Sequence, residues 1–224
     1  MSEITPIAYI ETPFDEKFGV PRQSGIADCP GRIVFAPAFR DCDAVRGLEG
    51  FSHIWLLWQF DRAAGHGWSP TVRPPRLGGN ERVGVFASRS PFRPNGLGLS
   101  AVELEHVSLD EEDSPVLYVR GADLVSGTPI FDIKPYLAYA DSYPDAAGGF
   151  TGGDAGEMLA VDFPPELLAQ FDSGERHGLL SALGADPRPR YQEDSERVYG
   201  MRYAGKNVRF TVSDGVVHVV EVET

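Results

Sequence analysis

Short apolar stretches separated by long loops run through the first 140 residues, and this pattern constrains the fold more than any other feature. The stretches alternate in polarity or are rich in β-branched and aromatic residues, which predicts strands. We expect these strands at residues 3–10, 32–36, 54–60, 83–87, 100–108, 116–120 and 129–133. So many short strands predict a β-barrel or a folded-over sheet. No strand-to-helix unit carries a G-x-G-x-x-G turn, which argues against a Rossmann-type enzyme.

Glycine and proline mark the connections between these strands. Long loops are expected at residues 11–31, 61–82 and 88–98. Residues 43–51 indicate one or two turns of helix, interrupted by glycines. Irregular connections as long as residues 61–82 are, in compact domains, usually functional or disordered.

The last third of the chain has a different pattern. Residues 141–157 are rich in glycine, alanine and aspartate and are typical of a linker. Short helices are expected at 164–171 and 176–183, and strands at 198–203, 208–212 and 216–222, with a hairpin turn at Asp214-Gly215. We therefore expect a β domain in residues 1–140, a linker in residues 141–157 and a small α+β domain in residues 158–224.

Charge is unevenly distributed along the chain. The formal net charge is −13, which is unlike a generic nucleic-acid coat protein. Between Arg62 and Val102 there are six arginines and one acid, Glu81, so this segment carries +6 − 1 = +5 and the rest of the chain about −18. A local cationic patch can direct a polyanion to one place. The alternative is that these arginines are scattered surface residues.

Several classes of protein do not fit the sequence. The longest apolar run, residues 51–60, is interrupted by polar residues and is too short to span a membrane. The first residues show no secretory signal. The only cysteines, Cys29 and Cys42, lack a C-x-x-C spacing and suit a reducing cytoplasm. His53 and His66 belong to no ligand cluster, so no metal site is expected.

Four stretches of sequence form an ordered set of motifs. They are KFGVPRQ at 17–23, DAVRGLEGFSHIW at 43–55, PTVRPPRLGGN at 70–80 continuing through VFASRSPFRPN at 85–95, and DLVSGTP at 123–129 followed by DIKPY at 132–136. Together they resemble the catalytic domain of the TsaA-like (TrmO-type) family. ADPRPRY at 185–191 resembles the C-terminal extension of bacterial members of the family.

The resemblance implies a fold and an activity. It implies an N-terminal single-sheet β-barrel that binds S-adenosyl-L-methionine (SAM), followed by a small C-terminal α+β domain that could bind tRNA. Members of this family methylate N6 of the threonylcarbamoyl-adenosine next to the anticodon in certain tRNAs, usually as homodimers. The expected protein is therefore a SAM-dependent tRNA (adenine-N6)-methyltransferase that works in the cytoplasm, with tRNA and a second copy of itself as partners.

The resemblance also implies site residues. Matching the family's cofactor loops gives the SAM-binding candidates Pro21, Arg22, Gln23, Asp61, Arg62, Arg89, Leu99, Arg120, Gly121, Ala122 and Asp123. The substrate-binding candidates are Arg93, Asn95, Arg73, Arg76 and Arg188. A guanidinium binds carboxylates and phosphates through a two-pronged contact, and both SAM and threonylcarbamoyl-adenosine carry a carboxylate. The alternative is that these arginines tie loop carbonyls together.

No catalytic base is evident from the sequence. Alignment of donor and acceptor supplies much of the rate of methyl transfer, but the acceptor nitrogen must lose a proton, so a nearby base would help. Asp123 and Asp132 are the carboxylates in the matched motifs. Each could instead anchor a turn or pair with an arginine.

One position departs from the family pattern. The family usually has proline after Arg-Pro-Asn, whereas Gly96 stands here and permits a positive φ.

Two alternative functions remain open. One is a dimeric β-barrel module without catalysis. The other is a SAM-binding protein that acts on a small molecule, or as a regulator, without tRNA. The charge of −13 favours this alternative, and the motif at 185–191 favours tRNA.

Trp55 and Trp58 are expected on opposite faces of their strand, where at least one packs in the core.

Overall fold

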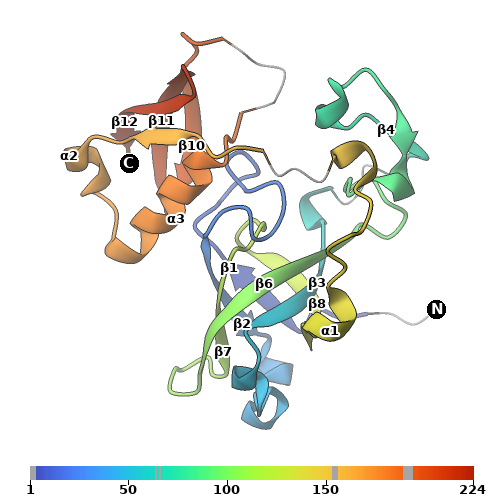
Figure 1. The fold of residues 1–224 in the computed structure, drawn as a ribbon. Coiled ribbons are helices and arrows are strands. Elements are labelled where there is room, and N and C mark those ends of the chain that lie inside the picture. The colour runs from blue at the N-terminus through green and yellow to red at the C-terminus, as the bar shows by residue number, and fades with distance from the viewer. Residues whose placement is uncertain (1–3, 64, 66, 153–155, 189–193) are drawn as a thin grey trace.

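The structure is a computed structural model that describes residues 4–63, 65, 67–152, 156–188 and 194–224, without the side chains of Ala63 and Arg76. A barrel forms the lower part of Figure 1. The C-terminal unit and an arm around strand β4 project above the barrel as two separate lobes. Among the described residues, none of the helices is long and apolar enough to cross a membrane.

A single antiparallel sheet closes on itself to form the barrel, which confirms the predicted fold class. Its strands are β1 (Ala8–Glu11), β2 (Pro30–Phe35), β3 (His53–Gln59), β6 (Leu97–Ser108), β7 (Val116–Arg120) and β8 (Thr128–Pro135). Their order around the barrel is β1-β2-β7-β6-β3-β8, and pairing of β8 with β1 closes the ring. Closure leaves no unpaired edge among these six strands.

Side chains point alternately to the inside and the outside along each strand, and the inward ones fill the barrel. On β3 the side chains of Ile54, Leu56 and Trp58 point inward and are buried, whereas Trp55 and Leu57 are only partly buried on the other face. The two tryptophans therefore lie on opposite faces, as predicted. The barrel core continues through inward residues of the other strands, such as Ile10, Ile33 and Val119.

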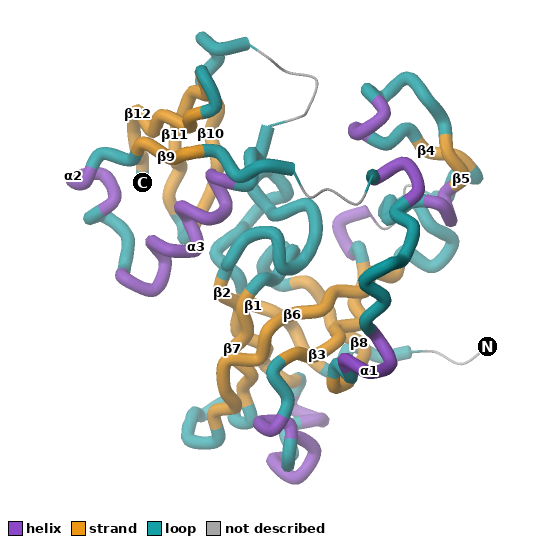
Figure 2. The backbone as a smooth tube through the Cα atoms, viewed as in Figure 1, coloured by secondary structure: helices purple, strands orange, loops and turns teal. Residues whose placement is uncertain are grey.

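Short elements occupy the loops between the barrel strands. The arm contains β4 (Thr71–Val72) and β5 (Val83–Gly84), which pair with each other, and the 3-10 helices η5 (Pro75–Leu77) and η6 (Val85–Ala87). The other 3-10 helices are η1 (Pro37–Phe39), η2 (Cys42–Val45), η3 (Leu48–Gly50), η4 (Asp61–Ala63) and η7 (Gly149–Thr151). The helix α1 (Ala138–Asp141) follows the barrel. Figure 2 shows how little of the arm is regular structure.

One local prediction was wrong. A strand was expected at residues 83–87, but β5 ends at Gly84 and residues 85–87 turn as η6, because its partner β4 is only two residues long. Residues 43–51 hold two short 3-10 helices, η2 and η3, with Gly47 in the left-handed region between them, as expected for one or two helical turns interrupted by glycines.

The C-terminal unit is a four-stranded sheet covered by helices. Its elements are β9 (Ala160–Asp162), α2 (Pro165–Leu168), α3 (Ser173–Gly184), β10 (Tyr199–Tyr203), β11 (Lys206–Ser213) and β12 (Val216–Glu223). The sheet order is β10-β11-β12-β9, with β9 parallel to β12. Asp214 and Gly215 both have positive φ between β11 and β12, which confirms the predicted hairpin turn.

The loop after β1 joins the two units. Phe14, Ala27 and Cys29 are buried in the core of the C-terminal unit, not in the barrel. The ring of Phe14 meets that of Tyr203 edge-on, with 5.3 Å between ring centroids. The segment that the sequence predicts as loop 11–31 therefore holds the C-terminal unit against the barrel.

Candidate functional site

A cavity of about 540 Å³ lies where β3 ends and β6 begins. Its apolar walls are formed by the side chains of Trp55, Leu57, Trp58, Phe60, Leu97 and Leu99. The pairing of β3 with β8 shifts register between Leu57 and Trp58, and side chains from both faces of β3 line the cavity there. A cavity of this size with apolar walls fits a small organic molecule.

Most of the predicted cofactor residues meet in this cavity. The lining includes Pro21, Arg22, Gln23, Asp61, Arg62, Arg89, Leu99 and Asp123, together with the predicted substrate residue Arg93. These residues come from four loops and from β6, which are far apart in the sequence. The conclusion is that the barrel brings the matched motifs together at one place.

The lining is cationic although the chain is acidic. Its charged side chains are Lys17, Arg22, Arg62, Arg89, Arg93, Asp61 and Asp123, which gives +5 − 2 = +3 against −13 for the whole chain. A positive cavity in an acidic protein attracts an anionic ligand to this place and disfavours it elsewhere. Carboxylates and phosphates fit this charge.

Two of the lining arginines hold loops together. The guanidinium of Arg93 donates to the carbonyls of Val85 at 3.1 Å and Ser88 at 2.6 Å. Arg62 donates to the carbonyls of Asp15 at 2.5 Å and Ser126 at 3.3 Å. These contacts match the alternative role considered from the sequence, in which the arginines hold loop carbonyls together and do not bind a ligand. They fix the shape of the cavity wall.

Arg89 and Gln23 link the first loop to the arm. The Nη1 atom of Arg89 donates to Oε1 of Gln23, and Nε2 of Gln23 donates to the carbonyl of Arg22 at 2.5 Å. Arg89 is exposed and lines the cavity. A ligand carboxylate there would meet a guanidinium whose position is already set by Gln23.

Arg22 connects the cavity to the C-terminal unit. Its Nη2 atom donates to the carbonyls of Asp186 at 3.2 Å and Arg188 at 2.6 Å. The guanidinium of Arg188 in turn donates twice to the carboxylate of Asp186, at 2.8 and 3.0 Å. Of the motif at 185–191, residues 189–191 lie outside the described part of the chain. The described half forms a turn at the cavity wall, and Arg188 holds this turn.

Asp123 is the half-buried carboxylate of the cavity. Its Oδ1 atom accepts a hydrogen bond of 2.6 Å from Ser100, and Ser100 accepts one of 3.0 Å from Nε1 of Trp58. Burial raises the pKa of Asp123 above its ordinary value, while the Ser100 hydrogen bond and the charge of Arg89 oppose this rise. Ser100 was not predicted as a site residue, because its single hydroxyl lies in an ordinary apolar strand pattern.

Other predicted residues lie outside this cavity. Among the described residues, Asp132 lies on β8, where its carboxylate pairs with Lys134 at 2.8 Å, and Ala122 is fully buried in the barrel core. Asn95 and Arg73 are exposed on the loops beyond the lining. The backbone of Arg76 lies in η5, and its side chain is outside the described part.

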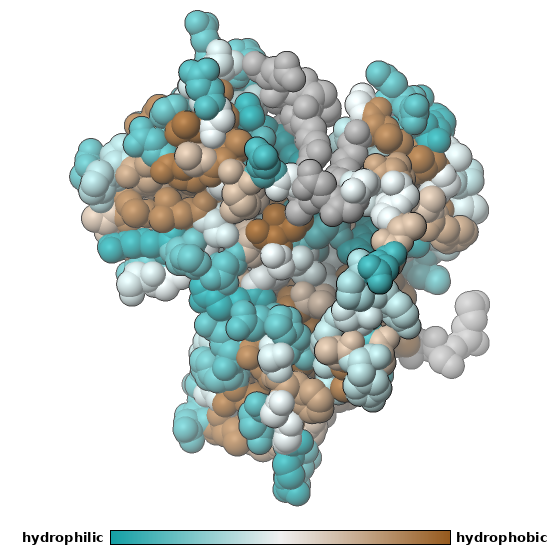
Figure 3. Space-filling view, in the orientation of Figure 1, coloured by the Kyte–Doolittle hydropathy of each residue, from teal (hydrophilic) through white to brown (hydrophobic). Residues whose placement is uncertain are grey.

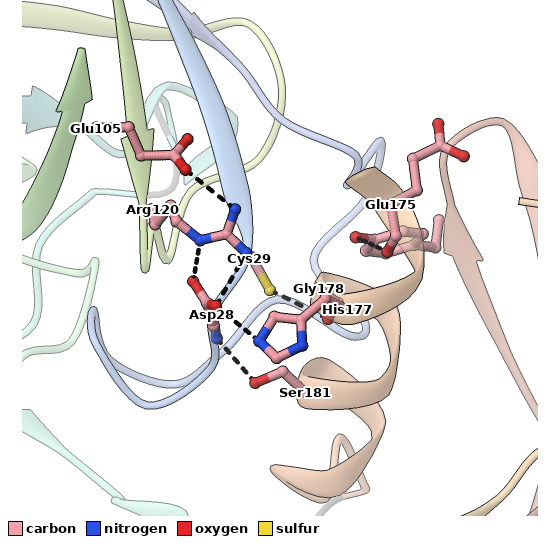
Figure 4. A network of polar contacts seen from close by, with 9 residues as sticks. Asp28, Cys29, Glu105, Arg120, Glu175, His177, Gly178 and Ser181 are labelled. Atoms are coloured by element: carbon pink, nitrogen blue, oxygen red, sulfur yellow. Dashed lines mark hydrogen bonds and ion pairs between the residues drawn. The ribbon is translucent and has the colours of Figure 1, made fainter. Parts of the chain in front are cut away.

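Arg120 and Gly121 belong to the contact between the barrel and the C-terminal unit. Figure 4 shows the guanidinium of Arg120 facing Asp28, with distances of 2.5 and 2.9 Å. Nε2 of His177 on α3 lies 2.7 Å from the same carboxylate. Gly121 exchanges backbone hydrogen bonds with the first loop, at Gly25 and Cys29. The prediction that these residues contact SAM therefore has no support from their position.

Gly96, the departure from the family pattern, has φ +58. Proline cannot adopt this angle, since its ring fixes φ near −65°. The carbonyl of Gly96 accepts a hydrogen bond from the amide of Phe60, which ties the loop to the end of β3. The loop beside the cavity therefore follows a path here that a proline would prevent.

Lys17 is one of the lining residues that the prediction missed although they lie in the matched motifs. It is the first residue of the matched KFGVPRQ motif and lines the cavity beside the other cations. Among the described residues, no group of three or more His, Cys, Asp or Glu side chains could hold a metal ion.

Comparison with known proteins identifies the family. Residues 9–142 match the profile described as the tRNA-methyltransferase O N-terminal domain, and residues 156–224 match the TrmO C-terminal domain. The tRNA (adenine(37)-N6)-methyltransferase of Escherichia coli strain K12 is 42% identical over 226 residues, which cover 97% of this chain and 96% of that protein. A Pseudomonas aeruginosa protein named putative S-adenosylmethionine-dependent methyltransferase RcsF is 40% identical, covering 89% of this chain and 87% of that protein.

Solved structures agree over the whole length. A crystal structure of TrmO superposes with a TM-score of 0.81 at 32% identity and covers 100% of both chains. The structure of TrmO from Pseudomonas aeruginosa gives a TM-score of 0.81 at 30% identity, covering 100% of this chain and 99% of that one. The chain therefore belongs to the tRNA-methyltransferase O family, which confirms the resemblance seen in its motifs and the enzyme class that the resemblance implied.

Proposed function

We propose that this chain transfers the methyl group of SAM to N6 of a threonylcarbamoyl-adenosine next to the anticodon of tRNA. The observation that carries the proposal is the cationic cavity, in which the motifs of the family meet although the rest of the chain is acidic. The E. coli relative is named as a methyltransferase of adenine 37 in tRNA. The threonylcarbamoyl group is our extension, and it is supported by the several arginines available for two carboxylates.

The cavity fits SAM by the chemistry of its walls. The apolar side chains Leu57, Phe60 and Leu99 suit the adenosyl part, and the cations suit the carboxylate of the methionyl part. When bound, SAM supplies a methyl group on a positively charged sulfur. We propose that Pro21, Gln23 and the neighbouring predicted residues of the lining hold the cofactor. Related proteins are named as SAM-dependent methyltransferases and as a probable SAM-binding protein.

The substrate side is proposed at the cavity mouth. Arg89 and Arg93 line the cavity, and the exposed Arg73 adds a further cation on the arm. We propose that residues 158–224 form a separate domain that helps to bind tRNA, since Asp186 and Arg188 of its motif contact the cavity residue Arg22. The acidic remainder of the chain would repel tRNA from other faces.

We also propose a homodimer and a cytoplasmic location. Several large apolar side chains of the arm and of β6 are exposed: Trp68 at 56%, Phe86 at 73%, Phe92 at 42% and Leu99 at 54%. Figure 3 shows apolar surface on the lobe that carries β4. An exposed apolar patch supports a protein interface. Light scattering at micromolar concentration should give twice the mass of 24.4 kDa, and a monomer mass would contradict the dimer.

The decisive test is mass spectrometry of tRNA nucleosides after incubation of tRNA with the protein and SAM. One tRNA pool comes from cells that make threonylcarbamoyl-adenosine and a matched pool from cells that cannot. We expect methylated threonylcarbamoyl-adenosine from the first pool alone. Methylation in both pools would remove the threonylcarbamoyl requirement. Stabilisation by SAM of about 2.7 kcal/mol at a hundred times its dissociation constant, without any methylated tRNA, would favour the alternative of a SAM-binding protein that acts on a small molecule.

A further inference from the structure

Three side chains form a hydrogen-bonded chain from the barrel interior to the cavity. Nε1 of Trp58 donates to Oγ of Ser100 at 3.0 Å, and this hydroxyl donates to Oδ1 of Asp123 at 2.6 Å. The donor and acceptor of each hydrogen bond are fixed, because an indole nitrogen can only donate and an ionised carboxylate can only accept. The Ser100 proton therefore points at Asp123.

Packing holds the first member of this chain in place. Trp58 is 7% exposed, and its ring meets that of Phe60 edge-on with 4.3 Å between centroids. A Cβ at Gly98, which pairs with Trp58 across the sheet, would lie 2.4 Å from the indole ring. A side chain at residue 98 would therefore displace the ring, and glycine there lets the indole lie flat across β6.

Burying polar side chains in a barrel core costs free energy unless each polar group is hydrogen-bonded. Among the residues that the structure describes, Ser100 and Thr128 are the buried polar ones. The hydroxyl of Thr128 donates to the carbonyl of Val125 at 2.6 Å and so closes a local turn. The hydroxyl of Ser100 leads instead to a carboxylate on the cavity wall. An alanine would fill the core there without a polar group that must be satisfied.

We propose that Asp123 accepts the proton that N6 of the adenine loses during methyl transfer, and that Ser100 and Trp58 are the residues that position it. The proposal rests on the proposed function. As N6 forms its bond to the methyl carbon, the bond between that carbon and sulfur breaks and its electron pair stays on sulfur. The N6 proton passes to the Asp123 carboxylate and then leaves to water at the cavity mouth.

The placement of the carboxylates distinguishes Asp123 from the other candidate. Asp132 lies outside the cavity lining and pairs with Lys134. Asp61 lines the cavity but is exposed in the 3-10 helix η4, where it accepts no hydrogen bond that would direct it within the described structure. Asp123 combines a position in the cavity with a fixed orientation.

The electrostatics of the cavity suit this role. Burial raises the pKa of Asp123, which makes its carboxylate a better proton acceptor near neutral pH than an exposed aspartate. The hydrogen bond from Ser100 and the positive charge of Arg89 limit this rise in the pKa of Asp123. The charged side chains that share the cavity with Asp123 are Lys17, Arg22, Asp61, Arg62, Arg89 and Arg93.

The first test separates proton transfer from binding. Asp123→Asn preserves the shape and can still accept from Ser100. We expect the maximal rate of tRNA methylation to fall by about 100- to 10,000-fold. The affinity for S-adenosyl-homocysteine, measured by calorimetry, should change little. A variant with the wild-type rate would overturn the proposal. So would a loss of affinity as large as the loss of rate, because Asp123 would then hold the cofactor.

The second test addresses Ser100, and its main measurement needs no enzymatic activity. The pKa of the Asp123 carboxyl is followed by carbon-13 NMR in the ligand-free protein. Ser100→Ala should raise it, because the hydroxyl favours the ionised form, and the acidic limb of the rate against pH should move the same way. Ser100→Thr, which keeps the hydroxyl, should restore both. Ser181→Ala, which removes a hydroxyl on α3 that accepts from the Asp28 amide, serves as the control and should change neither.

The outcomes keep the two proposals apart. An unchanged carboxyl pKa in Ser100→Ala would overturn the positioning role whether or not tRNA is methylated. Wild-type protein that methylates no tRNA would overturn the proposed function and the proton acceptor with it. Wild-type methylation together with full activity of Asp123→Asn would overturn the proton acceptor alone.

Discussion

Gly178 on α3 lies where that helix packs against the start of β2, and replacing it by alanine tests the contact between the C-terminal unit and the barrel (Figure 4). In a helix with free space, Gly→Ala stabilises by about 0.8–1.0 kcal/mol. At Gly178 the new Cβ would lie 2.6 Å from Oη of Tyr203 and 2.8 Å from Cδ of Pro30. Tyr203 is fully buried, and the Pro30 ring is fixed by the backbone of β2, so neither yields easily.

The magnitude follows from these two opposing effects. Overpacking costs about 1–3 kcal/mol, and the fixed partners place this site near the upper end. Subtracting the gain in helix propensity leaves a net destabilisation of about 2 kcal/mol. For a chain of this size, this corresponds to a fall in melting temperature of about 4–8 °C.

The assay is thermal unfolding followed by circular dichroism, with Gly174→Ala as the matched control. Gly174 lies on the same helix, and an added Cβ there would meet no described atom within 4 Å. We expect Gly174→Ala to raise the melting temperature slightly and Gly178→Ala to lower it. Equal and positive shifts for the two variants would refute the reasoning, because α3 would then not press on Pro30 and Tyr203.

Three further predictions concern charged residues. Arg89→Lys keeps the charge but loses the planar guanidinium and with it a contact of roughly 1.5–3 kcal/mol. The rate of methyl transfer should therefore fall about 10- to 100-fold, while the melting temperature stays unchanged. An unchanged rate would remove Arg89 from the site. Arg120 holds the pKa of the Asp28 carboxyl below its usual value, so the pair stabilises the fold above the unfolded-state pKa of about 3.9, and this contribution is lost as the pH falls through the folded-state value. Asp28→Asn should therefore lower the free energy of unfolding by about 1 kcal/mol near pH 7, a modest value because the carboxyl is partly exposed. The melting temperatures of the variant and the wild type should converge near pH 2. A difference in melting temperature that does not depend on pH would contradict this prediction. Arg188→Ala should loosen the turn that holds Arg22 and weaken cofactor binding by roughly tenfold in calorimetry, and full affinity would separate the turn from the site.

Local sequence patterns determined the elements and the class of fold. The apolar and aromatic run at residues 54–60 predicted a strand with Trp55 and Trp58 on opposite faces, and the structure confirms both. The Asp214-Gly215 pair specified a hairpin, because both residues tolerate positive φ. The ordered motifs identified the family and its enzyme class. These features depend on neighbours along the chain, so the sequence alone is sufficient to predict them.

The tertiary structure decided which of the candidate residues share a site. Arg120 and Asp123 stand three positions apart, yet Arg120 pairs with Asp28 at the contact with α3, while Asp123 faces the cavity. The partner of Asp123, Ser100, lies on another strand, and Arg22 meets the turn of Arg188 across 166 residues. Such contacts depend on how the barrel closes and where the C-terminal unit docks, and both are set by packing between distant segments that no local pattern encodes.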